Sequence, residues 1–354
     1  MPAVDTARRR PGAAIDRERA LGLLLVVVSA CGFGSGALFA KPIYAASVDW
    51  LTLLAWRFHF AAALSWAWLL PWPPNRRALR GMSRRRLAVL VVLGILYVGN
   101  SGTYFAGLET VPASLAALIV YLYPALVAVM SIRFARRLEG RRAWAALALA
   151  TLGVALAVGG IEPGTAPPVE GLLLVIAAPI IYAVWIILAA RLGGERAEPR
   201  REVAPAVPPY DSESAAEPES TEPAPAAAIM ITATAAGWWL AGLAVNRPLM
   251  PADIPAEAWP HLLGVGIIAT AIALQAFYAG ARRIGAAQAS LVSTVEPIYT
   301  IVLATLLFGE MLGPVQVVGG VLVIGGVLLA QLGEKGARQV DEVDLVSDEG
   351  RVRG

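Results

Sequence analysis

The chain has 354 residues, a formal net charge of +3, 57% hydrophobic residues and 16% charged residues, and its mean hydropathy is +0.64. This balance excludes an ordinary soluble domain. The basic residues are mostly arginines that flank apolar runs, so the sequence pI of 9.2 does not indicate nucleic acid as a partner. The single cysteine, Cys31, excludes an internal disulfide and a cysteine-based metal cluster.

The first segment, residues 1–19, is polar and rich in arginine, and we expect it to lie in the cytoplasm. The apolar run that follows contains the letters VSAC, which formally resemble a lipoprotein cleavage box ending at Cys31. The apolar run continues past this cysteine, and further apolar runs follow it. We therefore expect a retained first helix and no lipidation.

Ten apolar runs are long enough to cross a hydrocarbon core of about 30 Å, at about 1.5 Å per residue of helix. They lack the alternation that is typical of strands, which favours a helical bundle over a barrel. The expected spans are 21–40, 49–70, 87–108, 112–134, 143–160, 170–190, 226–245, 260–280, 285–308 and 314–332. The sequence thus predicts an all-α polytopic membrane protein with ten transmembrane helices.

The second half of the chain repeats the first half. Residues 104–130 align without a gap with residues 277–303, and the letters GLLLV at 22–26 recur at 171–175. Each half then contains five expected spans. Duplicated sets of spans are typical of secondary transporters, whose substrate site lies between the repeats.

We place the first repeat at residues 20–160 and the second at 170–332. The stretch 193–225 interrupts the second repeat and is rich in Pro, Glu, Ala and Ser, as expected of a disordered cytoplasmic linker. The end of the chain, 333–354, is expected to be a disordered cytoplasmic tail.

The charges predict the orientation. If ten spans alternate, all but three of the 29 Lys and Arg residues fall on one side, the exceptions being Lys41, Arg57 and Arg247. The positive-inside rule makes that side the cytoplasm, so both termini are expected inside. Because each repeat has an odd number of spans, the second repeat enters the membrane from the opposite side, and the repeats have inverted topology.

The third span carries a polar helix face. Four side chains recur at the spacing of one face: Tyr97, Asn100, Ser101 and Tyr104. Polar groups at mid-membrane are costly unless they bond to one another or line a wet cavity. This face therefore either lines a central cavity or supplies hydrogen bonds between helices, worth about 0.6–2 kcal/mol each.

Glu296 lies about midway along the ninth span and directly precedes Pro297. A proline lacks the N–H and frees a backbone carbonyl in the preceding turn. The equivalent pair in the first repeat is Tyr123 and Pro124, so both prolines are expected to break their helices near the midplane. A buried carboxyl group suits proton coupling or attraction of a cationic substrate; the alternative is that Glu296 bonds a nearby hydroxyl and only fixes packing.

Five further residues complete the candidate cavity. Arg57 lies toward the outer third of the second span, where it either reaches the outer headgroups or binds an anionic substrate group. Tyr182 and Trp185 in the sixth span either contact substrate or anchor the helix at the membrane interface. Gln275 and Tyr278 lie one turn apart in the eighth span.

The sequence contains none of the enzyme motifs that we considered. The chain has two histidines, no HExxH, no GxxxxGK[ST] loop and no paired-carboxylate DxxxD helix. We expect no enzymatic activity, no cofactor and no metal site.

Several short motifs together resemble the EamA branch of the drug/metabolite transporter superfamily. They are Phe33-Gly34-Ser35 with Lys41, Arg57, a run of small residues into Pro124, Glu296-Pro297, and an LFGE turn ending in Gly309 and Glu310 with Gly319 and Gly326 beyond it. The first repeat keeps Glu139 but has Ala146 at the match to Gly319. The resemblance implies two five-helix repeats with spans one, three, four, six, eight and nine around a central site.

The resemblance further implies export of amino acids or other small amphiphilic metabolites by alternating access. The alternatives are an uptake permease for a sugar or quaternary amine and, in a different class, a non-transporting membrane scaffold or lipid-modifying enzyme. The expected partners are a small-molecule substrate and the lipid bilayer, with proton coupling at Glu296 and a monomer or homodimer. Scarce Lys beside abundant Arg, Ala and Gly indicates a GC-rich bacterial genome, and hence the bacterial plasma membrane.

Overall fold

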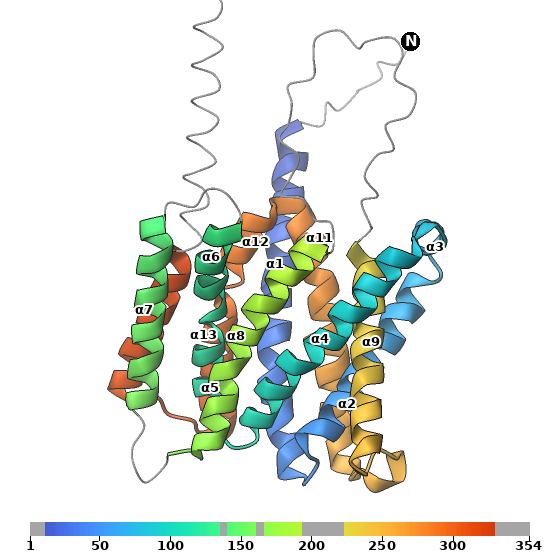
Figure 1. The fold of residues 1–354 in the computed structure, drawn as a ribbon. Coiled ribbons are helices and arrows are strands. Elements are labelled where there is room, and N and C mark those ends of the chain that lie inside the picture. The colour runs from blue at the N-terminus through green and yellow to red at the C-terminus, as the bar shows by residue number, and fades with distance from the viewer. Residues whose placement is uncertain (1–10, 135–139, 161–165, 193–222, 330–354) are drawn as a thin grey trace, which may run out of the picture.

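A computed structural model describes residues 11–134, 140–160, 166–192 and 223–329. In these residues the chain is helical throughout and forms no strand (Figure 1). The helices are α1 (Pro11–Ala45), α2 (Trp50–Leu69), α3 (Pro73–Gly81), α4 (Arg84–Leu108), α5 (Ala113–Val120), α6 (Tyr123–Phe134), α7 (Gly140–Gly159), α8 (Val169–Leu192), α9 (Pro223–Ala244), η1 (Pro251–Asp253), η2 (Ala256–Ala258), α10 (Trp259–Leu263), η3 (Gly264–Ile272), α11 (Ala273–Ile284), α12 (Ala286–Val292), α13 (Val295–Phe308) and a last helix, Pro314–Leu329.

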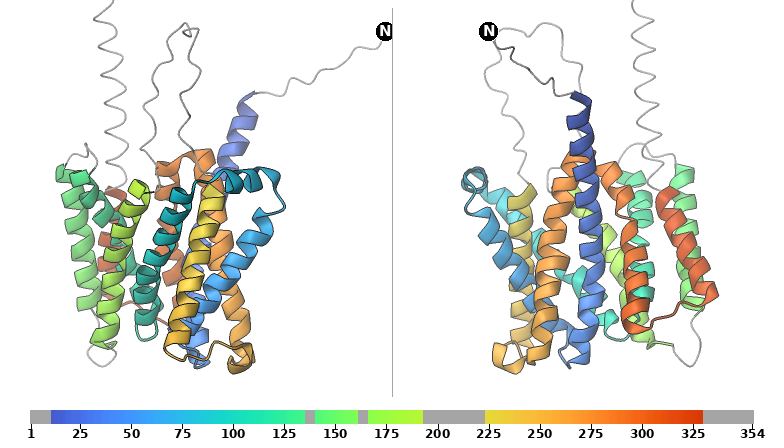
Figure 2. Two further views of the ribbon diagram at one scale, coloured as in Figure 1. Left: turned by 45° about the vertical axis from the view of Figure 1, so that its right-hand side comes forward. Right: turned by 180° about the vertical axis from the view of Figure 1, so that it is seen from behind.

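Every expected span coincides with a helix or with a broken helix. Seven helical stretches are long and apolar enough to cross a membrane, and α2 with α3 makes an eighth if this bent pair counts as one span. Two shorter apolar helices, Trp144–Gly159 and Pro314–Leu329, coincide with the fifth and tenth expected spans. The long helices lie side by side along one common direction in all three side views (Figures 1 and 2).

The structure differs from the expected boundaries in three places. α1 already begins at Pro11, so part of the N-terminal segment is helical. After α2 the chain turns by 109° into α3, because Pro73 and Pro74 cannot continue the helix but fit the first turn of a new one. α9 begins at Pro223, inside the expected linker, whose other residues, like those of the tail, lie outside the described residues.

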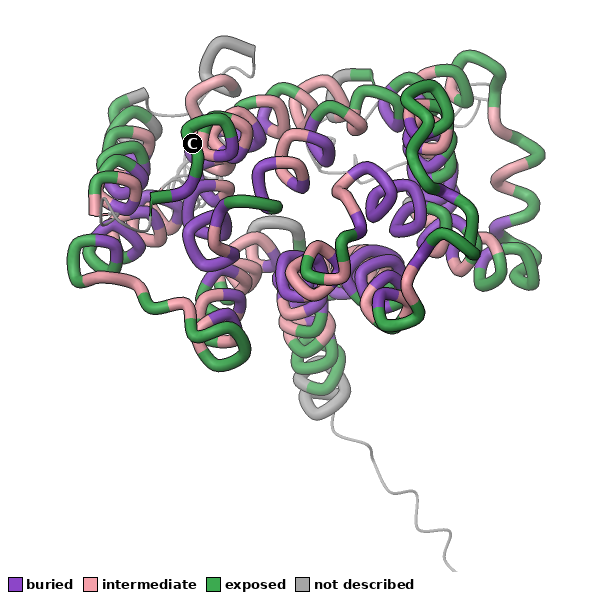
Figure 3. Tube along the Cα trace, turned by 90° about the horizontal axis from the view of Figure 1, so that it is seen from below, coloured by how far each residue is buried: buried purple, intermediate pink, exposed green. Residues whose placement is uncertain are grey.

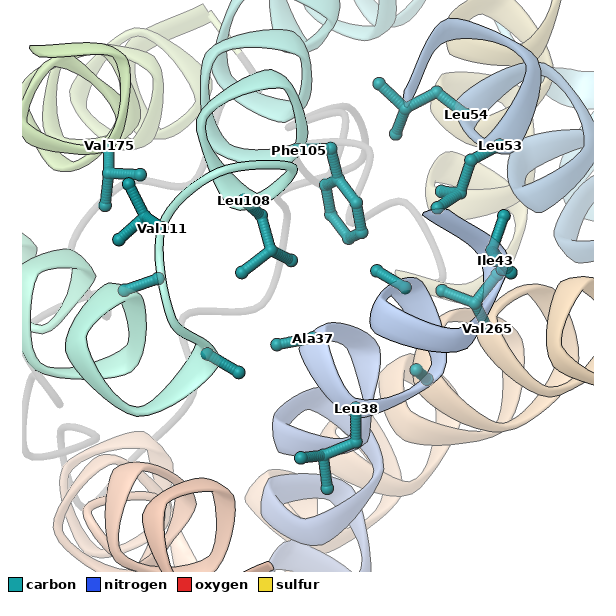
Figure 4. Close-up of a cluster of buried hydrophobic side chains, with 14 of the residues drawn as sticks. Ala37, Leu38, Ile43, Leu53, Leu54, Phe105, Leu108, Val111, Val175 and Val265 are labelled. Atoms are coloured by element: carbon teal, nitrogen blue, oxygen red, sulfur yellow. The ribbon is translucent and has the colours of Figure 1, made fainter. Parts of the chain in front are cut away.

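Buried residues lie on the helix faces turned toward one another, and exposed residues lie on the outer faces (Figure 3). Many of the exposed residues are large and apolar, among them Leu24, Leu173 and Leu306. One cluster of buried side chains joins α1, α2, α4, α8 and η3 at the middle of the bundle, as the close-up of Phe105, Leu108, Val175 and Val265 shows (Figure 4). Lipid contact requires an apolar exterior, so the apolar outer faces of these helices are consistent with a position in a bilayer.

Two helix crossings repeat the same contact in both halves of the chain. A Cβ atom added at Gly107 of α4 would lie 2.6 Å from Val175 Cγ2 and 2.8 Å from Gly171 O in α8. One added at Gly280 of α11 would lie 2.6 Å from Val26 Cγ2 and 2.9 Å from Gly22 O in α1. The repeated letters GLLLV thus supply the same surface twice, and each copy receives a glycine from the other half of the chain.

Candidate functional site

Two helices are interrupted at equivalent places. A turn at residues 121–122 separates α5 from α6, directly before Pro124, and a turn at 293–294 separates α12 from α13, before Pro297. Pro297 has no N–H to donate to Ser293 O four residues earlier, and this carbonyl instead accepts from Glu296 N–H at 3.0 Å. The Tyr121 hydroxyl is a second donor to Ser293 O, at 2.6 Å, where the proline N–H is missing.

The same hydroxyl lies beside Glu296. Tyr121 Oη is 3.1 Å from Glu296 Oε2. Its hydroxyl has one proton, so it can donate a hydrogen bond either to Ser293 O or to the carboxylate. With the proton on the shorter bond to Ser293 O, a protonated Glu296 can itself donate to the Tyr121 oxygen. An ionised Glu296 instead needs the hydroxyl proton, so its protonation changes how the two broken helices are joined.

Aromatic rings from three helices gather near this junction. Tyr123 lies 4.8 Å from Tyr182, centroid to centroid, and Tyr97 lies 5.1 Å from Trp185. Tyr182 stacks on Trp185 with an angle of 16° between the ring planes. Tyr121 lies 5.8 Å from Tyr123, which connects the rings to the carboxyl group of Glu296. Four of the expected site residues and Tyr121 thus form one aromatic cluster beside Glu296: Tyr97, Tyr123, Tyr182 and Trp185. Tyr278 is within electrostatic range of Tyr182.

Arg57 is buried, so the expectation that it reaches the outer headgroups is wrong. Its Nε donates to Thr270 Oγ1 at 2.8 Å, and its guanidinium carbon lies 4.6 Å from the ring centroid of Phe105. A planar guanidinium stacks well on an aromatic ring and is less strongly hydrated than an ammonium group. These contacts hold the side chain inside the bundle rather than at its edge.

Tyr104 connects the two charged groups electrostatically, because it is within electrostatic range of both Arg57 and Glu296. No described acidic side chain pairs with Arg57, and no basic one in the described part of the chain pairs with Glu296. The site therefore contains one basic and one acidic group, neither paired with an opposite charge among the described residues.

The remaining expected residues are used differently. Ser101 Oγ accepts a hydrogen bond from Trp238 Nε1 of α9 at 3.2 Å, so this part of the polar face serves helix packing. Asn100 is buried and hydrogen bonds with Tyr97. Gln275 has a buried Nε2 with no hydrogen-bond partner, and no described contact joins it to the aromatic cluster.

Sequence reasoning missed three parts of the site. Tyr121 is two residues before the proline pair that was considered, and its role appears only when α5 meets α13. Tyr299 lies one turn after Glu296, and its hydroxyl is 3.0 Å from Ser35 Oγ, which itself donates to Cys31 O. In the π-helix η3, the side-chain Oγ1 of Thr270 donates a hydrogen bond to Val265 O, five residues back. Nothing in the local sequence indicates this wider helical turn.

Among the described residues, no group of three His, Cys, Asp or Glu side chains could hold a metal ion. The polar atoms of the site are hydroxyl groups, one carboxyl group and one guanidinium. Such a set can bind an organic ion by hydrogen bonds and ring contacts.

The comparisons with known proteins identify the family of the chain. The model of the "EamA-like transporter family" matches residues 20–159 and 222–332. The chain is 25% identical over 311 residues to the "Uncharacterized transporter YcbK" of Bacillus subtilis (strain 168), covering 86% of this chain and 90% of that protein. A solved crystal structure matches with a TM-score of 0.56 at 20% identity, covering 91% of this chain and 99% of that one, which shows likeness of fold alone.

Proposed function

The chain belongs to the EamA-like transporter family, and from this premise we propose that it is a secondary transporter of ten membrane-crossing helices in two inverted five-helix repeats. The first repeat would contain α1, α2 and α4–α7, and the second α8–α13 and the last helix. The matched contacts of Gly107, near the end of α4, with α8 and of Gly280, near the end of α11, with α1 support this arrangement, since α4 and α11 end at opposite faces of the bundle (Figure 1). We further propose that the face carrying the N-terminus and the arginines of α3 is cytoplasmic.

The observation that carries the proposal is the junction at Glu296. Two interrupted helices, one from each repeat, meet there through the Tyr121 hydroxyl. Broken helices at the repeat interface are where secondary transporters place their substrate and coupling ions. A buried carboxyl group that changes the bonding of Ser293 O when it loses its proton could couple proton movement to the rearrangement of α12 and α13.

The substrate class follows from what the site lacks. Within the described ranges Arg57 has no acidic partner and Glu296 has no basic partner, although an unpaired charge inside a membrane protein is costly. A substrate with a carboxylate and an ammonium group would supply both partners, and the rings of Tyr97, Tyr182 and Trp185 would contact its apolar part. This favours amino acids or similar small amphiphilic metabolites, and we propose that the protein exports them from a bacterial cell through the plasma membrane.

Untargeted comparison of metabolites inside and outside the cell tests this function. Cells that overproduce the protein should accumulate one or a few zwitterionic compounds in the medium, whereas cells that overproduce Glu296→Gln should not. Accumulation inside the cells would instead indicate uptake. If neither compartment changes across strains with equal amounts of membrane-inserted protein, the transport function is wrong.

A further inference from the structure

One carboxylate binds the start of α5 at the face opposite the N-terminus. Glu310, which follows α13, accepts hydrogen bonds from the backbone N–H groups of Ala113 at 2.9 Å and Ser114 at 2.8 Å. Its Oε2 also accepts from Ser114 Oγ at 2.7 Å. The first N–H groups of a helix have no partner within the helix, and a carboxylate there also meets the positive end of the helix dipole. Glu310 therefore bonds α5 through three donors.

Lys41 holds the same turn from the other side. This residue of α1 donates from Nζ to Leu108 O at 2.8 Å and to Val111 O at 2.6 Å, where α4 ends. It is also within electrostatic range of Glu310. The turn between α4 and α5 is thus fixed by a cation on its carbonyl groups and by a carboxylate on its N–H groups.

The turn after α13 is built to aim Glu310 at α5. Gly309 has a φ of 67°, which ends the helix in the left-handed region that glycine adopts without strain. Gly309 N–H then donates to Thr305 O at 3.0 Å, and Thr305 Oγ1 donates to Glu310 O at 2.7 Å. The LFGE sequence therefore forms a turn that holds the Glu310 carboxylate in a fixed position.

α5 is joined to α13 at both of its ends. At the inner end Tyr121 bonds Ser293 O and Glu296, and at the outer end Ser114 and Ala113 bond Glu310. The two helices are the halves of the broken spans that run from the middle of the bundle to the face opposite the N-terminus (Figure 1). A route from Glu296 to that face that uses the repeat interface has to pass between them.

We propose that Glu310 and Lys41 form an outer clip that holds α5 against α13 and closes the route from Glu296 to the outside. The clip must open for the outward-facing state. The inference rests on the proposed function, because it assigns a state of the transport cycle to this structure. It makes Glu310 a positioning residue, which acts through α5 on the junction of Tyr121 with Glu296.

A cysteine placed between the two ends of α5 reports whether the clip is closed. Ala117 lies about one helical turn from both Ser114 and Tyr121, on the face of α5 turned to α13, and is 4% exposed. In a Cys31→Ala background, Ala117→Cys should react slowly with a membrane-impermeant maleimide added to intact cells. Adding Glu310→Ala removes three charge-assisted hydrogen bonds and should raise the labelling rate at least about tenfold.

Glu109 provides the matched control. It is also a carboxylate at this face, and its Oε1 accepts from Trp50 N–H at 2.7 Å, but it joins α4 to α2 within the first half of the chain. Glu109→Ala should leave labelling at residue 117 unchanged. Lys41→Ala and Ser114→Ala should raise the labelling rate at residue 117. The effect of Ser114→Ala should be smaller, because it removes one of the three bonds to Glu310. If Glu310→Ala is not recovered as a monodisperse protein, these two variants test the clip in its place.

The outcomes separate the clip from the transport function. Unchanged labelling in Glu310→Ala, Lys41→Ala and Ser114→Ala, in a protein whose wild type exports metabolites, would overturn the clip and leave transport standing. Faster labelling in a protein that moves no metabolite would support the clip as a closed outer contact while the transport function fails. Equal acceleration by Glu109→Ala would show general loosening of this face and would also overturn the clip.

Discussion

At the scale of single residues, the site is defined by groups whose usual partners are missing. Pro297 has no N–H for Ser293 O, which accepts instead from Glu296 N–H and from the Tyr121 hydroxyl at the end of α5. Arg57 rests on Phe105 and Thr270 and faces no acidic group in the described part of the chain. Missing partners of this kind are expensive in a membrane interior, so a ligand or a proton that supplies them has a physical reason to bind there.

Glu296→Gln tests the carboxyl group itself. The amide keeps the size and can still meet the Tyr121 hydroxyl, but it cannot take up or lose a proton. Transport into vesicles with an imposed pH gradient should fall strongly and lose its pH dependence, while thermal stability should hold, because no charge remains to be buried. Near-normal, pH-dependent transport by this variant would show that Glu296 only fixes packing.

Arg57→Gln tests recognition of an anionic group. Loss of the guanidinium should weaken transport of a zwitterion at least about tenfold, the equivalent of one charge-assisted interaction. Transport of the matching amine without a carboxylate should change little, so the ratio of the two rates is the measurement. Stability should not drop, since an unpaired buried charge is removed. A proportional loss for both substrates would instead assign Arg57 a structural role.

At the scale of elements, the helix breaks and the close crossings between helices have separate structural roles. The breaks at residues 121–122 and 293–294 create the site, whereas the glycine crossings set how closely the two halves of the chain pack. Small residues permit such contacts between membrane helices, where packing rather than the hydrophobic effect drives association. The π-helix η3 adds a third device, because its wider turn presents Thr270 to Arg57.

Gly107→Ala and Gly280→Ala should therefore destabilise the protein. Each added Cβ would lie 2.6 Å from a valine methyl group and less than 3 Å from a backbone oxygen of a neighbouring helix, so a helix must shift. We expect a cost of about 1–3 kcal/mol in the free energy of unfolding, read as a lower melting temperature in detergent.

Gly99→Ala in α4 is the control for these two variants. The nearest atom to its added Cβ is Ile181 Cγ2 at 3.8 Å, an ordinary contact. Alanine favours a helix over glycine by up to about 1 kcal/mol, so the melting temperature should hold or rise. Equal destabilisation by all three variants would show that the crossings at Gly107 and Gly280 carry no special packing.

At the scale of the whole molecule, the arrangement predicts which parts face which side of the membrane. The arginines of α3 lie at the face that carries the N-terminus, whereas η1 lies at the opposite face (Figures 1 and 2). In a Cys31→Ala background, Asp253→Cys should react with an impermeant maleimide in intact cells. Ser212→Cys, in the expected linker, should react only after permeabilisation. The reverse pattern would invert the proposed orientation.

Shortening the linker between α8 and α9 should leave the membrane part intact. The sequence of 193–222 supplies few large apolar groups for a core, and the linker only has to join the end of α8 to the start of α9. Folded yield and transport should both remain near wild type after removal of about half of it. Complete loss of folded protein would give this segment a structural role.

The sequence by itself determined the features that depend on composition and repetition. Continuous apolar runs long enough for a bilayer, without the alternation of barrel strands, are helical there, so the helical fold of the described residues followed from run length and hydropathy pattern. The duplicated letters pointed to two related halves, and the proline pairs pointed to the two interruptions, which the structure places at residues 121–122 and 293–294.

Only the tertiary structure decided which side chains meet. The contacting pairs are far apart in the chain, so local sequence spacing cannot predict their contacts. They are Tyr121 with Glu296, Ser114 with Glu310, and Arg57 with Thr270. Ser101 and Tyr104 share a helix face in sequence, yet Ser101 bonds Trp238 whereas Tyr104 is within electrostatic range of Arg57 and Glu296. The physical reason is that a helix face is wide enough to touch two neighbours, and the packing of the helices, not their periodicity, selects which neighbour each residue reaches.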